Sequence, residues 1–201
     1  GFCLLILLLS TKIYAVQAIV SYTIFYIPAQ GSTPARPYAE VSWQIDPTSI
    51  HYNQDKNGQW SSQLTASIVF SNDTGVVMKD KYNWNRPATD SIHAGSQMLI
   101  DLHRYVLPAG NIKMDIILAE NGHTDQFNFT DSFTVAPPAE QPYYSGLQLL
   151  DTAYKYPEEN VFSKNGNIQI PLNLNFYNDD RSHIYFYAEL YNVSSLSKEE
   201  E

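Results

Sequence analysis

The chain has 201 residues, of which 44% are hydrophobic and 13% aromatic, and it carries a formal net charge of -9. This composition supplies enough apolar side chains for one or two packed domains and excludes a disordered chain. Its 21 acidic residues against 12 basic ones repel phosphate backbones, so we expect no nucleic acid among the partners.

The N-terminal residues have the pattern of a signal peptide. An unbroken apolar run extends from Phe2 to Leu9, which is shorter than the roughly 20 residues of a bilayer-spanning helix but suits a signal-peptide core. Val16 and Ala18 are acceptable residues for cleavage after Ala18, so we predict a signal peptide over residues 1–18 and no transmembrane helix. The alternative is that the apolar run forms a buried strand or a short helix.

The only cysteine, Cys3, lies within this apolar run, so the exported part would have no disulfide. Small secreted animal domains usually depend on disulfides, and their absence favours a bacterial envelope protein, periplasmic or extracellular. Thiolate metal sites and thiol catalysis are excluded for the same reason. The sequons that begin at Asn72, Asn128 and Asn192 are then chance matches to a short pattern.

From residue 19 onward, apolar and polar side chains alternate with the period of two that half-buried strands require. Turn sequences such as Asn57-Gly58 and Asn121-Gly122 separate the alternating runs. We therefore predict an all-β fold that begins with an immunoglobulin-like β-sandwich over residues 19–136. The predicted strands cover residues 20–27, 38–45, 49–53, 59–71, 76–84, 97–106, 111–120 and 126–136.

The parity of each run predicts which side chains enter the core. Trp43 and Trp60 follow the core parity, whereas the position of Trp84 stays open. Arg104 has the parity of apolar neighbours in its strand, so we expect an ion pair with a carboxylate such as Asp101 or Asp131, and His103 is predicted at the surface. The predicted core also contains Ala39, Val41, Ile45, Leu64, Ala66, Ile68, Phe70, Ile112, Met114, Ile116, Leu118, Phe127, Phe129, Phe133 and Val135.

A second β region follows a stiff, proline-rich linker at residues 137–142. We predict a hairpin around Asn165-Gly166, a strand from Ile168 to Phe176 and a last strand from His183 to Tyr191. Together these predict a second β-sandwich over residues 143–201. Four strands are few for a sandwich, so we expect this one to be incomplete and the protein to continue.

Three stretches of the chain together resemble one known family. They are Pro37-Tyr38-Ala39-Glu40-Val41, Asp101-Leu102-His103-Arg104-Tyr105 and Gly166-Asn167-Ile168-Gln169-Ile170-Pro171. In this pattern the chain resembles the N-terminal region of the exported GWxTD-domain proteins of Gram-negative bacteria. The Gly-Trp-x-Thr-Asp motif that names the family does not occur in this sequence. The resemblance implies an envelope location and tandem β domains, and it brings no established activity.

Catalytic motifs are missing from the sequence. Neither a Gly-x-Ser-x-Gly elbow nor a phosphate-binding glycine loop occurs, and the histidines form no His-Glu-x-x-His or His-x-His pattern. We therefore expect no enzyme activity, no cofactor and no metal. The five histidines, each isolated in the sequence, are His51, His93, His103, His123 and His183.

Four aspartates fall in predicted turns, where their ordinary role is to stabilise the turn. A calcium ion would need about six oxygen ligands, and no EF-hand spacing is present. These aspartates are Asp73, Asp125, Asp179 and Asp180.

The best candidate for binding is one face of the last predicted strand, which carries several tyrosines. A flat tyrosine face could stack a glycan or dock a protein, because tyrosine combines apolar area with a hydroxyl. The alternative is that the first domain or the continuing chain covers this face. The face comprises Tyr185, Tyr187, Tyr191, His183 and Glu189, while Ile184, Phe186, Ala188 and Leu190 take the opposite face.

These observations predict an exported, non-catalytic β-sandwich protein that acts as a structural or protein-interaction module of the bacterial envelope. The alternatives are a carbohydrate-binding accessory module and the non-catalytic part of a larger enzyme. The expected partner is another envelope protein or a glycan. Sandwich edges allow a second chain to pair, but nothing in the sequence defines an oligomeric state.

Overall fold

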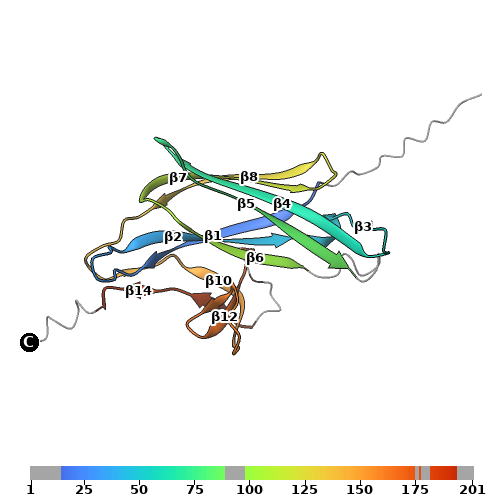
Figure 1. Ribbon diagram of the computed structural model, residues 1–201. Coiled ribbons are helices and arrows are strands. Elements are labelled where there is room, and N and C mark those ends of the chain that lie inside the picture. The colour runs from blue at the N-terminus through green and yellow to red at the C-terminus, as the bar shows by residue number, and fades with distance from the viewer. Residues whose placement is uncertain (1–14, 89–97, 175–176, 178–181, 194–201) are drawn as a thin grey trace, which may run out of the picture.

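The computed structural model describes residues 15–88, 98–174, 177 and 182–193, and within them the protein is almost entirely β (Figure 1). The predicted all-β class is confirmed. The described helical structure is the single 3-10 turn η1 (Pro47–Ser49), and none of the described segments forms a helix with the length and hydropathy that a bilayer crossing requires. The first strands are β1 (Ala18–Ile27), β2 (Arg36–Ile45), β3 (Asn53–Gln54), β4 (Trp60–Asn72), β5 (Gly75–Ala88), β6 (Leu99–Val106), β7 (Gly110–Glu120) and β8 (Gln126–Val135). The remaining strands are β9 (Tyr143–Tyr144), β10 (Gln148–Lys155), β11 (Ser163–Lys164), β12 (Asn167–Pro171), β13 (Tyr185–Tyr187) and β14 (Leu190–Tyr191).

The first eight strands form two antiparallel sheets that lie face to face (Figure 1). One sheet has the order β1-β2-β6, and the other contains β4, β7 and β8 in that order, with β5 and β3 also paired to β4. In chain order, β1 and β2 belong to the first sheet, β3 to β5 to the second, β6 to the first, and β7 and β8 to the second. The chain therefore crosses between the layers repeatedly, which ties the two sheets into one β-sandwich.

The core lies between these sheets and matches the predicted parity of β2, β4 and β7. Apart from Trp60, the predicted core residues of these three strands, from Ala39 to Leu118, are at most 1% exposed. Trp43 is fully buried, Trp84 packs beside it with ring centroids 5.8 Å apart, and Trp60 is half-buried at the start of β4. The phenylalanines of β8 are partly buried against the same core.

The prediction of which face of β6 points into the core is wrong. Leu99 and Tyr105 belong to the sandwich core, so Asp101 and His103 also point inward, and the His103 ring stacks on Tyr82 at 4.0 Å. Leu102 lies on the opposite face and is nevertheless buried, at 5% exposure, because further strands cover that side of the sheet. A sheet buried on both faces cannot be oriented from alternation alone.

Turn chemistry is confirmed at the predicted places. Gly58 and Gly122 both have positive φ angles, of 81° and 87°, which glycine adopts without strain. Asn165 and Gly166 have φ angles of 49° and 74° and connect β11 to β12, as expected for a type I′ hairpin. The strand predicted over residues 49–53 is wrong for residues 49–52, because Ser49 ends η1, which Asp46 starts by accepting a hydrogen bond from the Thr48 amide, and β3 begins only at Asn53.

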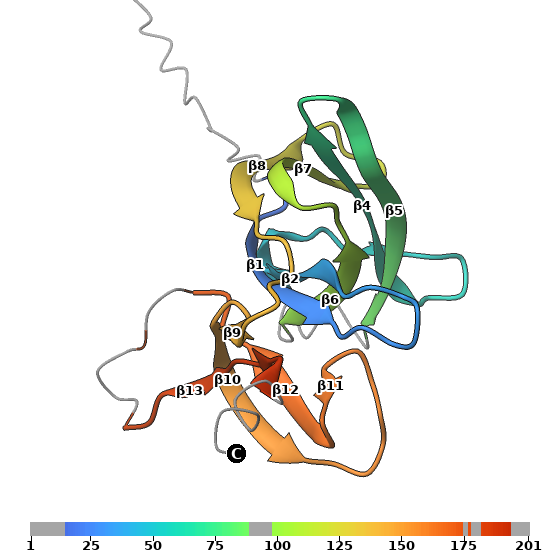
Figure 2. The same cartoon turned by 90° about the vertical axis from the view of Figure 1, so that its left-hand side faces the viewer.

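The C-terminal strands form two further sheets that make a third layer, named here the C-terminal layer (residues 143–174, 177 and 182–193). One sheet has the order β11-β12-β10-β13, and β14 pairs with β9. Figures 1 and 2 show this layer against the outer face of the β1-β2-β6 sheet. The single strand predicted from His183 to Tyr191 is instead divided into β13 and β14. Phe176 and residues 194–201 lie outside the described residues, and a second facing sheet stays a prediction.

Residues before the predicted boundary at residue 19 already take part in the sandwich. Val16 is 3% exposed within the sandwich core, and β1 starts at Ala18. The Gln17 amide donates to Ser49 Oγ at 2.8 Å, so these residues are held by the sandwich. The apolar run from Phe2 to Leu9 and His93 lie outside the described residues.

Candidate functional site

A cleft of about 760 Å³ opens where the C-terminal layer meets the edge of the sandwich. Such a volume is in the range of about 300–1,000 Å³ found for small-molecule sites. Strand ends of β1, β2 and β6 form one wall, and the segment from β13 to β14 forms the other. The residues that give the cleft its chemistry are Tyr26, Tyr38, Arg104, Tyr187, Glu189 and Tyr191.

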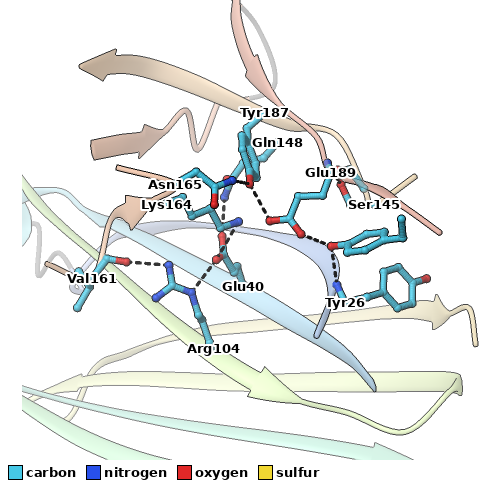
Figure 3. A network of polar contacts seen from close by, with 12 residues as sticks. Tyr26, Glu40, Arg104, Ser145, Gln148, Val161, Lys164, Asn165, Tyr187 and Glu189 are labelled. Atoms are coloured by element: carbon cyan, nitrogen blue, oxygen red, sulfur yellow. Dashed lines mark hydrogen bonds and ion pairs between the residues drawn. The ribbon is translucent and has the colours of Figure 1, made fainter. Parts of the chain in front are cut away.

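Beneath the cleft, Glu40 is the centre of a buried ionic network (Figure 3). Its side chain is 1% exposed, and its Oε1 atom accepts from Arg104 Nε at 2.7 Å and lies 3.0 Å from Lys164 Nζ. Gln148 Nε2 donates to Oε2 at 3.2 Å. A buried carboxylate needs such partners, because an unpaired charge away from water is strongly unfavourable. The network therefore joins β2 and β6 of the sandwich to β10 and β11.

Lys164 is the most enclosed cation of this network. Its side chain is 10% exposed, and its Nζ atom lies 3.2 Å from the centroid of the Phe25 ring and 4.7 Å from that of Tyr187. Burial lowers the pKa of Lys164, and the nearby Glu40 carboxylate opposes that shift. The ammonium group is thus held between a carboxylate and two aromatic faces, which favour a cation.

A second carboxylate, Glu189, organises the tyrosines on the other wall (Figure 3). Tyr187 donates to Glu189 Oε1 at 2.7 Å, and Tyr191 donates to Oε2. The Tyr191 hydroxyl also accepts from the Tyr26 amide at 2.9 Å, while the Glu189 amide donates to Ser145 Oγ at 2.9 Å. Burial, together with the bond to Glu189, raises the pKa of Tyr187 and of Tyr191, so both hydroxyls stay protonated donors.

The structure divides the predicted tyrosine face between the inside and the surface. Tyr191 is 8% exposed and packs edge-on against Tyr26 at 5.3 Å, and Tyr187 is half-buried with its ring 5.8 Å from Phe25. Tyr185, at 44%, and His183 are exposed. These three tyrosines do not form one flat exposed surface, because the hydroxyls of two of them find partners at the junction with the sandwich.

Large apolar side chains of the same segment are also exposed. Ile184 is 67% exposed, Phe186 62% and Leu190 44%. We name these three side chains the apolar strip. Ile184 and Phe186 have the parity predicted for the face opposite the tyrosines, and they are the most exposed of these side chains. Leu190 has the same parity but also lines the cleft, and Tyr185 is as exposed as Leu190. Tyr187 and Tyr191 are less exposed because they pack at the junction with the sandwich.

Sequence analysis missed Glu40, Lys164 and Gln148 as site residues. Glu40 occupies a polar position of an alternating strand, which ordinarily faces water. Its contact with Gln148 joins residues 108 positions apart, and its contact with Arg104 spans 64. Arg104 does form the expected ion pair, but with Glu40 rather than with Asp101 or Asp131. No local pattern marks these partners.

Among the described side chains, one group of three could hold a metal ion. His51, Glu120 and His123 each offer a ligand atom, and these atoms lie within 4.8 Å of one another. Two of the histidines that are isolated in the sequence are therefore neighbours in space. Asp73 and Asp125 lie outside this group, and Asp179 and Asp180 lie outside the described residues.

Chemically, the cleft offers ring faces, hydroxyls and the edge of Arg104, which is 39% exposed and also donates to the Val161 carbonyl at 3.0 Å. Glu40 and Glu189 are each already engaged by two or more donors. This arrangement suits binding better than general acid–base chemistry, which needs a carboxyl group able to exchange its proton with a substrate.

No family model matches this chain, and neither does any curated protein or solved structure.

Proposed function

We propose that this chain is an exported, non-catalytic β-sandwich protein that serves as a structural or protein-interaction module of the bacterial envelope. The apolar strip is the observation that carries the proposal. Ile184, Phe186 and Leu190 present large side chains to water at 67%, 62% and 44% exposure. Monomeric proteins rarely group exposed apolar residues in this way unless a partner covers them.

The position of the strip supports a protein partner. The strip extends from just before β13 into β14, and among the described strands β13 is an edge strand of the four-stranded sheet, so a partner could use both the side chains and that strand edge. The segment is also anchored to the sandwich, because the Tyr191 hydroxyl, which donates to Glu189, accepts from the Tyr26 amide of β1, and this contact holds the strip on a rigid support. A preorganised apolar surface loses little conformational entropy on association.

Export and an immunoglobulin-like architecture are parts of the same proposal. The apolar run from Phe2 to Leu9 supports export, and the lack of thiols beyond Cys3 supports a bacterial origin. The sheets β1-β2-β6 and β5-β4-β7-β8 have the strand order that we interpret as immunoglobulin-like. The resemblance to GWxTD-domain proteins agrees with this location and architecture.

Site-specific photo-crosslinking in the native host tests the interaction. Benzoylphenylalanine at Phe186 should give an adduct of discrete mass, whereas the same group at Tyr154, which is 49% exposed, should not. Tyr154 is a matched control because it is an exposed aromatic residue of the same sheet. An adduct of twice the protein's own mass would identify the partner as a second copy. If neither position gives an adduct, the protein-interaction proposal is wrong.

A second candidate, glycan binding, is favoured by the cleft. Its walls combine tyrosine rings with hydroxyl and guanidinium groups, the mixture that sugars contact through their apolar faces and their hydroxyls. Val106→Trp would fill the cleft from its exposed rim, where Val106 is 40% exposed. Ile117→Trp, at a residue 41% exposed elsewhere on the sandwich, is the matched control. A glycan that binds the native protein and the control but not V106W would support this candidate, and a glycan array without any hit would remove it.

A further inference from the structure

Three side chains from two distant parts of the sequence meet at the end of the sandwich away from the cleft. His51 follows η1, Glu120 ends β7, and His123 lies in the turn between β7 and β8. The cleft is bounded by the far ends of β1 and β6, at Ile27 and Val106. The two places therefore belong to opposite ends of the strands.

Glu120 is held in position by the sandwich. Its side chain is 3% exposed, and its Oε1 atom accepts from the His51 amide at 2.8 Å and from Ser62 Oγ at 2.9 Å. The other oxygen, Oε2, lies 2.9 Å from His51 Nδ1. One carboxylate oxygen is thus fixed by the protein, and the second points toward imidazole. Hydrogen bonds of this kind orient ligating carboxylates in metal sites.

The two imidazoles stand next to each other over this carboxylate. Their ring centroids are 4.2 Å apart and their planes differ by 15°. His51 is 48% exposed and His123 is also exposed, so both rings can reorient and a metal ion can reach them from solvent. The His123 amide donates to the Glu120 carbonyl at 3.1 Å, which keeps the turn beside its partner.

We propose that His51, Glu120 and His123 form a binding site for one zinc-type divalent metal ion. Two imidazole nitrogens and a carboxylate oxygen are a common ligand set for zinc with a fourth position open to water. Zinc bonds to these atoms are about 2.0–2.2 Å long, so tetrahedral ligand atoms lie about 3.4 Å apart. The ligand atoms now lie within 4.8 Å of one another, and the two exposed rings would rotate from their stacked arrangement so that their nitrogen atoms converge on the ion. The metal would take the place of the present hydrogen bond between His51 Nδ1 and Glu120 Oε2.

The ligand types decide which ions suit the site. Calcium and magnesium prefer six or more oxygens and bind imidazole poorly, whereas zinc, nickel and copper favour it. Because His51 precedes β3 while Glu120 and His123 flank the end of β7, the ion would join two loops that are 69 residues apart in sequence. It would stabilise this end of the sandwich without taking part in the cleft.

Zinc titration of the purified protein tests the proposal. Calorimetry with Zn²⁺ alone should give saturable binding of one ion per chain, and saturation should raise the melting temperature. His123→Ala removes one ligand from an exposed position and should weaken binding at least tenfold. His183→Ala removes an exposed histidine of the C-terminal layer and should leave the affinity unchanged.

Two further measurements separate a built site from adventitious binding by surface histidines. Ser62→Ala removes a hydrogen bond to Glu120 without removing a ligand and should weaken zinc binding by about 10-fold or more. Co²⁺ should give the intense visible absorption of a four-coordinate ion in the native protein but not in His51→Ala. No saturable zinc binding by the native protein, or equal binding by H51A, H123A and the native protein, would overturn the proposal.

Discussion

At the scale of single residues, Gly146 decides how closely the C-terminal layer approaches the sandwich. Its amide donates to the Ile24 carbonyl at 2.8 Å on the edge strand β1. A Cβ atom at this position would lie 2.8 Å from Thr23 Cγ2 and 3.3 Å from the backbone of Ile24. We therefore expect Gly146→Ala to lower the free energy of unfolding by about 1–3 kcal/mol, the usual effect of overpacking. Urea denaturation of the two proteins measures the difference.

The neighbouring threonine supplies the control for this prediction. Thr23→Ser removes the methyl group that the new Cβ atom would meet, so the double variant T23S/G146A should recover part of the lost stability. If G146A alone unfolds at the same urea concentration as the native protein, the layers are not in the close contact described here.

Asp101 should make the stability of the protein depend on pH. Although burial by itself would raise the pKa of Asp101, hydrogen bonds from His103 and Trp84 lower it below its ordinary value of 3.8. The Trp84 Nε1 donor lies 2.6 Å from Oδ2. A carboxyl group with a depressed pKa in the folded state stabilises the protein fully above its unfolded pKa, and this contribution is lost as the pH falls through the folded pKa.

Asp101→Asn should therefore be less stable than the native protein by about 1 kcal/mol at neutral pH, the difference between a charged and a neutral acceptor. The gap in unfolding free energy should close as the pH falls below 3.8, where the native carboxylate becomes protonated. Chemical denaturation of both proteins at several pH values measures this difference in unfolding free energy. A gap that stays constant down to pH values well below this would show that the charge of Asp101 has no role.

At the scale of elements, the Glu40 network connects the sandwich to the C-terminal layer. Glu40→Ala would leave Lys164, which is 10% exposed, without its carboxylate partner. Breaking a buried pair in this way destabilises proteins by about 3–5 kcal/mol. We expect E40A to lose that much stability in urea and to become sensitive to protease at the linker, residues 137–142.

Glu140→Ala provides the matched control, because Glu140 is an exposed glutamate of that linker and the same charge is removed. E140A should behave like the native protein in both assays. If E40A and E140A are equally stable, the network contributes nothing to docking of the layer.

The elements themselves could be predicted from the sequence because their determinants are local. Alternation in β4 and β7 and the turn pairs Asn57-Gly58 and Asn165-Gly166 specify strands and hairpins without knowledge of their partners. The orientation of β6 and the burial of Glu40 could not be predicted, because a third layer covers the outer face of their sheet. The grouping of His51 with Glu120 was hidden for a related reason, since it depends on the placement of two distant loops.

At the scale of the whole molecule, the three-layer arrangement changes what the protein presents to its surroundings. Stacking of the C-terminal layer on the β1-β2-β6 sheet takes Tyr187 and Tyr191 into the junction and leaves Ile184 and Phe186 outside, while Leu190 lines the cleft between them. The same docking creates the cleft, which is lined by both the sandwich and the C-terminal layer. The surface available for recognition is therefore produced by contact between layers and not by any one strand.

The burial of Val16 bears on where the signal peptide is cleaved. A cut after Ala18 would remove Val16, which is 3% exposed in the core. It would also remove Gln17, whose backbone forms hydrogen bonds with Ser49 and Asp46. Loss of a buried valine alone lowers stability by about 1.5–3 kcal/mol. Ala15 is a small residue directly before Val16, so we expect signal peptidase to cut there and the exported protein to begin at Val16.

Expression of the chain with an added start codon in a Gram-negative host, followed by N-terminal sequencing of the periplasmic fraction, identifies the cleavage site. Purified residues 16–201 and 19–201 should then differ in urea denaturation, the shorter protein being the less stable. A periplasmic product that begins at Ile19 and is as stable as the longer one would contradict the role given to Val16. If the product keeps residues 1–15 and stays in the cytoplasm, export itself is the incorrect part, because the fold around Val16 does not depend on the compartment.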